Sequence, residues 1–463
     1  MNMLRSNTLY KTLFPLAVPI VAQSLIMSLL NVVDVLMIGQ LGEVEVAGVG
    51  LSNQIVFILQ LLLYGVGGGV GIFAAQFWGK KDLENIYNSI GIGLLIAFIA
   101  AGIFSVVSLL APRSVLGLFT PDPEVIEIGS GYLFTIVPTF LAMAVTVTYS
   151  LSLRSLGFAR LPMMVSVSAL SVKTLLGYLM IFGVLGFPAM GVHGAALSTL
   201  IARLLECVTL LVLVYVRRTP LAAPLLRLLK FKWDFVVCYL KTVTPLIINE
   251  GFWAIGIATY SAIYARISTE SLAAVNILLT IEQLAFVIFA GIGNATAILA
   301  GNLIGENRPG EAFNLARRVM LLNLIGALLL GGVLFAASNG IISLYNVSDA
   351  ARYYARTLIR IFSLVLWIRA CYIVVLLTIR GGGDTRYSMI IDLVTLWGVG
   401  VPMALLGAFV FHLPVYWVYL MIASEELVKL GLLLWRFFSK KWIHDLSAGV
   451  PGEALEQAEC LVE

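Results

Sequence analysis

The chain has 463 residues, of which 60% are hydrophobic and only 12% are charged, and its mean hydropathy is +1.00. A soluble globular protein has about 45–50% apolar and about 25% charged residues, so this composition excludes that class and indicates an integral membrane protein. The formal net charge of +4 is too small to suggest a nucleic-acid partner. The four cysteines and three histidines are scattered without ligand spacing, so we expect no disulfide framework, no metal site and no cofactor.

Twelve apolar runs along the chain are long enough to be membrane helices. A helix needs about 20 mostly apolar residues to cross the hydrocarbon core of a bilayer. The sequence therefore predicts an all-α integral membrane protein with twelve transmembrane helices. The predicted spans are residues 13–38, 50–77, 86–110, 126–150, 162–183, 191–216, 236–264, 272–303, 316–337, 354–379, 388–410 and 415–437.

Basic residues in the connections indicate the orientation. With the N-terminus in the cytoplasm, 19 loop Lys and Arg residues are cytoplasmic, and four are not: Arg113, Arg266, Arg352 and Arg356. We therefore expect a multi-pass protein of the cell inner (plasma) membrane with both termini cytoplasmic. A basic connection between spans six and seven predicts two lobes. The expected organisation is an N-terminal six-helix lobe at 1–218, a basic cytoplasmic linker at 219–235, a C-terminal six-helix lobe at 236–440 and a polar cytoplasmic tail at 441–463.

The two halves of the chain repeat each other at one constant spacing. The positions of Pro19 and Pro245 differ by 245 − 19 = 226, and the same offset relates further pairs: Gly65 with Gly291, Gly79 with Gly305, Arg154 with Arg380, and Met163 with Met389. An ungapped offset across four helices indicates an internal duplication. Because each half has six spans, both enter the membrane in the same direction, which predicts lobes related by a pseudo-twofold axis along the membrane normal.

Several stretches in both halves together resemble the multidrug and toxic compound extrusion (MATE) family. They are residues 33–39 (VDVLMIG), 74–79 (AAQFWG), 154–157 (RSLG) with Pro162-Met163, 191–196 (GVHGAA), 300–305 (AGNLIG) and 380–384 (RGGGD). The resemblance implies a V-shaped pair of lobes around a central cleft. It also implies export of small amphipathic, often cationic compounds in exchange for H⁺ or Na⁺, by a protein that contacts membrane lipids and works as a monomer.

Asp34 is a carboxylate inside the first apolar run, with Asn31 on the same helical face. A carboxylate within a membrane helix costs roughly 2.5–3.5 kcal/mol on insertion scales, so such a group is a functional-site candidate. By resemblance, Asp34 matches the aspartate that the family uses for cation coupling. The alternative is a carboxylate held in a structural ion pair.

Lys173 marks a departure from the family. Many relatives have an Asn on the fifth helix and an Asp four residues later, whereas this chain has Lys173 and Gly177. The oxygen ligands that Na⁺ needs are therefore missing, although Na⁺ at Asp34 stays possible. We expect Lys173 to pair with Asp34 and to be released when Asp34 is protonated, which favours H⁺; the alternative is a lysine that extends toward an interface. Thr199 is the expected neighbour by resemblance.

The second half carries its own polar residues within apolar runs. Asn249 and Glu250 follow Pro245, Glu282 and Gln283 lie in the eighth span, and Arg369 lies in the tenth. We expect them to form a second polar or substrate site. Arg369 could hold Glu250 or Glu282 ionised or could be a structural partner, and Asp392 is a further candidate partner. The carboxylates do not repeat, since the offset between the halves relates Glu250 to Ser24 and Asp34 to Tyr260.

The remaining candidates have weaker patterns. Aromatic and polar residues expected to line the substrate cleft are Asn31, Tyr64, Tyr149 and Tyr260. Pairs at helical spacing are expected to be structural: Arg203 with Glu206, and Glu425 with Lys429. We expect Arg154 and Arg380 to lie in cytoplasmic loops. Glycine-rich runs at 65–71 and 291–293 predict close helix packing or a hinge, because they lack the ending of a phosphate loop.

The sequence thus favours a secondary antiporter that is driven by H⁺ more readily than by Na⁺ and works by alternating access. A flippase for lipid-linked precursors or polysaccharides is the alternative within the same superfamily, because Lys173 and Arg369 suit an anionic headgroup. A membrane-embedded enzyme would need convergent His, Asp or metal-ligating residues, which are not visible, so we expect no enzyme. A membrane scaffold would not need a duplicated cleft with buried carboxylates.

Overall fold

The computed structural model describes residues 6–229, 233–343, 345 and 347–446 of the chain. These residues are almost entirely helical, and within them an isolated antiparallel bridge between Gly383 and Ile443 is the one β-type contact. The middle of the expected linker, at 230–232, and most of the expected polar tail, from 447 onward, lie outside the described residues.

Eight helices form the first half, followed by one short turn of helix. Their bounds are α1 Ser6–Gly39, α2 Glu43–Gly79, α3 Leu83–Leu110, α4 Pro112–Gly117, α5 Pro123–Ile136, α6 Pro138–Ser155, α7 Arg160–Phe182, α8 Val192–Val216 and α9 Leu225–Leu228. The second half contains α10 Trp233–Ile267, α11 Thr269–Gly305, α12 Pro309–Ser343, α13 Asp349–Gly381, α14 Thr385–Thr395, the π-helical η1 Leu396–Gly400, α15 Val401–Leu405, the π-helical η2 Leu406–Val410 and α16 Val415–Phe438.

The twelve-helix membrane fold is confirmed, with two instructive details. In the described part of the chain, ten helices are long and apolar enough to cross a membrane, and the bent pair α5–α6 makes an eleventh. The two helices of that pair meet at 54° next to Pro138, which lacks the N–H of a continuous helix. The twelfth predicted span is α16, whose 24 residues are interrupted by charged side chains at Glu425, Glu426 and Lys429. These charges lower its hydropathy, but the helix is intact.

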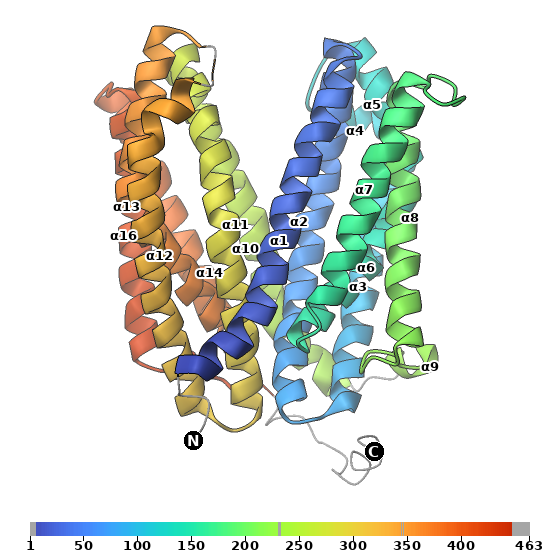
Figure 1. Cartoon of the computed structure of the whole chain (residues 1–463), viewed down its shortest axis with the longest axis vertical. Coiled ribbons are helices and arrows are strands. Elements are labelled where there is room, and N and C mark those ends of the chain that lie inside the picture. Colours follow the sequence, from blue (N-terminus) through green and yellow to red (C-terminus); the bar gives the residue numbers. More distant parts are fainter. Residues whose placement is uncertain (1–5, 230–232, 344, 346, 447–463) are drawn as a thin grey trace. The chain divides into compact units, whose positions relative to one another are not determined.

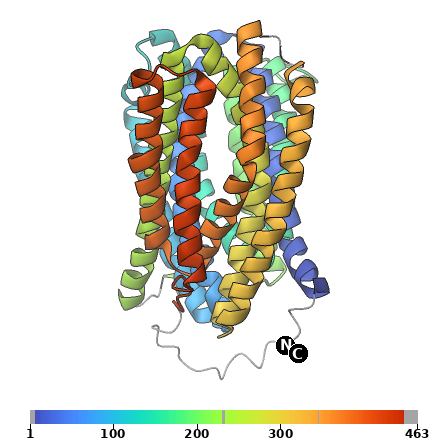
Figure 2. The same ribbon diagram turned by 90° about the vertical axis from the view of Figure 1, so that its left-hand side faces the viewer.

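The chain divides into two compact units. The N-terminal unit covers residues 18–243, and the C-terminal unit covers residues 6–17 and 244–446 among those described. The boundary falls inside α10, beside Pro245. Within each unit the long helices run side by side along a common direction (Figures 1 and 2). In the C-terminal unit α13 packs against α11, α12 and α16, which gives this helix the most buried position.

Glycines allow the close helix contacts that the sequence predicts. A Cβ atom on Gly69 of α2 would lie 2.2 Å from Cγ2 of Val243 in α10, and one on Gly67 would lie 2.7 Å from Cδ1 of Leu151 in α6. In the second half, a Cβ on Gly293 would lie 2.8 Å from Cδ1 of Leu377. Contacts this short would force a neighbour to move, so glycine fits these positions without strain. Close packing by small residues is a common way to join membrane helices.

Candidate functional site

Asp34 and Lys173 form an ion pair between α1 and α7 in the N-terminal unit. The Lys173 Nζ atom lies 2.5 Å from Asp34 Oδ2, and the two side chains are 13% exposed for Asp34 and 20% exposed for Lys173. This is the contact expected from the sequence. Among the described residues, no other ion pair is formed by either group. The pair is therefore electrically neutral as a unit, and each charge is compensated by the other.

The surroundings of this pair supply few oxygen ligands. Tyr132 of α5 is buried, and it lies within electrostatic range of Thr199 of α8 and of Asp34. The Thr199 hydroxyl donates to the Ala195 carbonyl at 2.9 Å. A hard cation such as Na⁺ needs several oxygen ligands. In this conformation the lysine ammonium occupies the position next to Asp34 that such a cation would need.

A second ionic group lies nearby in the same unit. Arg203 Nη1 lies 2.9 Å from Glu206 Oε2, as the i, i+3 spacing predicts, and Ser166 donates to Glu206 Oε1 at 2.6 Å. Arg203 also lies within electrostatic range of Lys173. Glu206 is thus satisfied by two donors and buried, which fits the structural role expected for this pair.

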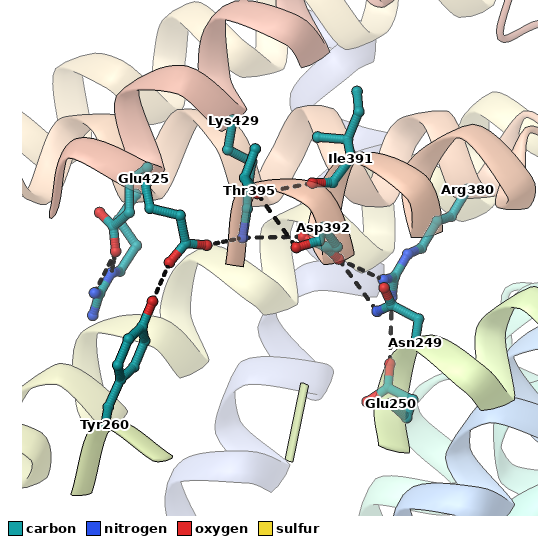
Figure 3. Close-up of polar contacts among 11 residues, drawn as sticks. Asn249, Glu250, Tyr260, Arg380, Ile391, Asp392, Thr395, Glu425 and Lys429 are labelled. Atoms are coloured by element: carbon teal, nitrogen blue, oxygen red, sulfur yellow. Dashed lines mark hydrogen bonds and ion pairs between the residues drawn. The ribbon is translucent and has the colours of Figure 1, made fainter. Parts of the chain in front are cut away.

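The C-terminal unit holds a continuous chain of ionic contacts, shown in Figure 3. Lys429 Nζ bridges Glu425 Oε1 at 2.8 Å and Asp392 Oδ1 at 3.1 Å. The second Asp392 oxygen is 3.1 Å from Arg380 Nη2, and Arg380 Nη1 is 3.4 Å from Glu250 Oε1. The contact predicted within α16 is therefore present, but it belongs to a network that joins α10, α13, α14 and α16.

Two neutral donors also bind this network, one at its Glu425 end and one at its centre. Tyr260 of α10 donates to Glu425 Oε2 at 2.7 Å, and the Asn249 amide donates to Asp392 Oδ2 at 3.2 Å (Figure 3). The Thr395 hydroxyl, close to Asp392 on α14, donates to the Ile391 carbonyl at 2.8 Å. The π-helical segment η1 begins at the next residue, Leu396, and such segments are frequent at functional sites.

Arg369 of α13 belongs to a separate group. Its Nη1 atom lies 2.7 Å from Glu282 Oε2, and its Nε and Nη2 atoms both donate to Glu426 Oε1. Tyr419 donates to the other Glu282 oxygen at 2.5 Å. Of the two predicted partners, Glu282 is therefore correct and Glu250 is wrong, because Glu250 lies on Arg380. Asp392 is also bound by Arg380 rather than by Arg369.

The expectation that Arg154 and Arg380 lie in cytoplasmic loops is wrong. Both lie in the last turn of a helix, α6 and α13, and both side chains point into their own unit. Arg154 Nη2 donates to Gln23 Oε1 at 2.8 Å. The glycines that follow each arginine resemble a loop in sequence, but the first of them in the second half, Gly381, is still helical because it packs on Ala297.

The sequence patterns do not predict that α16 lies at the centre of the ionic contacts in the C-terminal unit. The sequence patterns single out neither Glu426 nor Tyr419, although both bind the Arg369 group. The available signal was the cluster of three charges, Glu425, Glu426 and Lys429, in the middle of an otherwise apolar run. Charges at such a depth are costly and need partners.

The expected cleft residues occupy different environments. Tyr149 and Tyr260 are buried at 2% and 8% exposure, and the hydroxyl of Tyr260 donates to Glu425. Tyr64 is 40% exposed and accepts a hydrogen bond from Gln60. Asn31 and Gln283 are exposed on their helices. In the described part of the chain, no three His, Cys, Asp or Glu residues are grouped to hold a metal ion.

Comparisons with known proteins give matches along most of the chain. The MatE family model matches it twice, at residues 19–179 and 245–406. Curated relatives include the probable multidrug resistance protein NorM of Thermotoga maritima, 24% identical over 93% of both chains, and that of Burkholderia pseudomallei, 27% identical over 95% of this chain and 94% of the other. The uncharacterized transporter YisQ of Bacillus subtilis is 24% identical over 93% of this chain and 95% of its own length.

Solved structures show the same fold. A MATE crystal structure in the bent conformation superposes with a TM-score of 0.85 at 18% identity, covering 94% of this chain and 96% of the other. A Pyrococcus furiosus transporter of the MOP superfamily, described as having a binding pocket of reverse polarity, gives a TM-score of 0.83 at 18% identity, with 94% and 97% coverage.

Proposed function

Because this chain belongs to the MATE family of membrane transporters and is not an enzyme, we propose that it is a secondary antiporter that exports small amphipathic compounds in exchange for protons. The relatives named for multidrug resistance support drug-like substrates. The observation that carries the proposal is the partly buried ion pair between Asp34 and Lys173.

The pair suits a proton-driven switch for a simple electrostatic reason. The opposite charges of Lys173 and Asp34 lie in direct contact, so the pair as a whole is neutral and each charge is compensated in an apolar surrounding. A proton on Asp34 would leave the lysine charge unpaired, and an unpaired buried charge costs several kcal/mol in proteins. Helices α1 and α7 would then have to rearrange so that Lys173 reaches water or another acceptor. The two conformations needed for alternating access would differ in this contact.

The ligand set favours H⁺ over Na⁺ in this proposal. Lys173 and Gly177 replace the oxygen-bearing residues expected for Na⁺, and the hydroxyl of Thr199 donates to a carbonyl of its own helix. In the C-terminal unit, the ionic groups contain more carboxylates than cations. Its two groups contain 5 carboxylates and 3 cations, a difference of −2 if every group is ionised. The carboxylates are Glu250, Glu282, Asp392, Glu425 and Glu426; the cations are Arg369, Arg380 and Lys429.

The flippase alternative has less support. It relied on Lys173 and Arg369 as free cations for an anionic headgroup, but both are bound to carboxylates of the chain. We further propose that both termini are cytoplasmic and that a single chain is the working unit. Without Arg154 and Arg380, which lie inside helices, 19 − 2 = 17 cations on the expected cytoplasmic side against 4 on the other support this orientation.

The test is transport in proteoliposomes with a pH gradient and a Na⁺ gradient imposed separately, using a cationic dye. We expect dye transport with the pH gradient alone, and we expect Asp34→Asn to abolish it. Glu127→Gln, which alters an exposed pair with Arg113, is the matched control and should transport normally. The double variant Asp34→Asn/Lys173→Met removes the unpaired lysine charge, so it should recover thermal stability without recovering transport. Transport driven by Na⁺ alone, or undiminished transport by Asp34→Asn, would contradict the proposal.

A further inference from the structure

Arg154 carries a guanidinium without a carboxylate partner in the described part of the chain. Its Nη2 atom donates to Gln23 Oε1 at 2.8 Å, which is a neutral acceptor. Its Nε atom is inaccessible and lacks a hydrogen-bond partner among the described residues. A charge held inside a protein is normally paired, because an unpaired one is expensive in an apolar medium.

The internal repeat shows what is missing around Arg154. Its counterpart in the second half, Arg380, is paired with Glu250 and Asp392. The residues of the first half at the same offset are Ser24 (250 − 226) and Ser166 (392 − 226), both neutral. The Ser166 hydroxyl moreover donates to Glu206. The first half has therefore kept the guanidinium and has neither of the carboxylates that balance it in the second half.

The ionic groups described above for this unit do not supply the missing charge. The two carboxylates of the ionic groups described in this unit, Asp34 and Glu206, are bound to Lys173 and Arg203. Together with Arg154 these groups sum to 3 cations and 2 carboxylates, a difference of +1. The surplus positive charge is thus the charge of Arg154 itself.

We propose that Arg154 and Gln23 form a binding site for a small monovalent anion, such as a carboxylate group. The planar guanidinium has five N–H donors, and one of them is used by Gln23, so several remain for an oxyanion. Arg154 as a residue is intermediate in exposure, which leaves part of it open to an anion, whereas Gln23 is 4% exposed and holds the guanidinium in place. Charge-assisted bonds of this kind are about twice as strong as neutral ones.

The anion could be a free ion or the carboxylate of a transported compound. In the second case the site, which then rests on the proposed function, would extend the substrates of the transporter to zwitterionic amphiphiles. The two sources share one chemistry and can be separated by the probe used. Neither measurement requires coupled transport, so a failure here is distinct from a failure of the proton-coupling test on Asp34.

The first arm measures the thermal unfolding midpoint of the purified full-length protein during titration with sodium acetate, with acetamide, the neutral isostere of acetate, as the reference titration. We expect the midpoint of the wild type to rise and saturate with acetate, as for any ligand that binds the folded state. Arg154→Gln should show no such rise. Arg113→Gln, the same change at an exposed arginine that is paired with Glu127, should respond as the wild type does.

The second arm measures binding of two dyes by fluorescence anisotropy. Rhodamine 110 carries a free carboxylate, and rhodamine 123 is its methyl ester. Arg154→Gln should raise the dissociation constant of rhodamine 110 at least ten-fold and change that of rhodamine 123 less than two-fold. A response to acetate alone assigns the site to free anions, and a difference between the dyes assigns it to the substrate.

Ser24→Glu is a second variant that does not depend on the stability of Arg154→Gln. It restores to the first half the carboxylate that Glu250 provides in the second, so it should occupy Arg154 and remove the response to acetate while the protein stays folded. The proposal is overturned if the wild type responds to neither acetate nor the dye carboxylate. It is also overturned if folded Ser24→Glu keeps the full acetate response.

Discussion

Arg369→Met tests whether the Arg369 group is needed to hold α11, α13 and α16 together. The guanidinium lies 2.7 Å from Glu282 Oε2 and binds Glu426 through two donors, and all three side chains are at most 19% exposed. Methionine has a similar length and packs well in apolar surroundings, so the change removes the charge with little loss of volume. It leaves two buried carboxylates close to each other without a cation.

Removing one partner of a buried ion pair typically costs about 3–5 kcal/mol of stability. Arg369 has two such partners, but one of them can take up a proton, so we expect a loss at the upper end of that range rather than twice as much. Thermal unfolding of the purified protein in detergent measures this loss. Arg113→Met is the matched control, because its pair with Glu127 is exposed at 71% and 67%.

A compensating variant sharpens the test. Arg369→Met combined with Glu282→Gln and Glu426→Gln removes all three charges, and replacing a whole buried ionic group by neutral residues is often close to neutral in stability. We therefore expect the triple variant to be more stable than Arg369→Met alone. If Arg369→Met unfolds at the same temperature as Arg113→Met, the ionic group does not stabilise the unit, and the reasoning is refuted.

Two further predictions concern the packing and the ends of the networks. Tyr260→Phe removes the donor that lies 2.7 Å from Glu425 Oε2, so it should cost about 1.5–3 kcal/mol in thermal stability, as expected for a hydrogen bond to a charged group, whereas Tyr178→Phe on an exposed face should cost nothing measurable. Gly69→Ala places a Cβ 2.2 Å from Val243 and should destabilise by about 1–3 kcal/mol, as for overpacked cores. A Cβ atom on the neighbouring Gly68 would have no other atom within 4 Å, so Gly68→Ala should be neutral or slightly stabilising. Equal effects at both glycines would contradict the packing argument.

The spans were predictable from the sequence because hydropathy is a local property. Each apolar run of about 20 residues forms a helix wherever it lies in the fold. The bend between α5 and α6 was also available in principle, since Pro138 stands in the middle of the fourth run. The expectation failed at Arg380, where a glycine-rich stretch resembles a loop. The helix continues there because Gly381 packs directly on Ala297, a tertiary contact that no local pattern contains.

The ionic site was predictable only in part, for a related reason. The contact between Asp34 and Lys173 could be inferred because each is an isolated charge in an apolar run and the family relates their helices. In the C-terminal unit, by contrast, eight charged residues can be paired in many ways. The sequence does not reveal which pairing is chosen, because this depends on how α13 is rotated against α11 and α16. One of the two partners predicted for Arg369 is therefore correct, and the other is wrong.

The repeat links these networks to the way the two halves have diverged. The starts of the two family matches differ by 245 − 19 = 226, the same offset that relates the paired residues of the two halves. The second half departs from the first at the π-helical η1, at 396–400, which lies inside the second match. It follows directly after Asp392 and Thr395, so this departure lies next to the network that binds Lys429 and Arg380.

Leu396 packs against Gly256 of α10, and Gly400 packs against Tyr260 of the same helix. This packing leaves Tyr260 in position to bind Glu425. The first half has Asp34 at the position of Tyr260 and a continuous α7 at the position of η1. In the first half, Asp34 is paired with Lys173 of the uninterrupted helix α7. In the second half, the cation of the network is Lys429, which comes from α16.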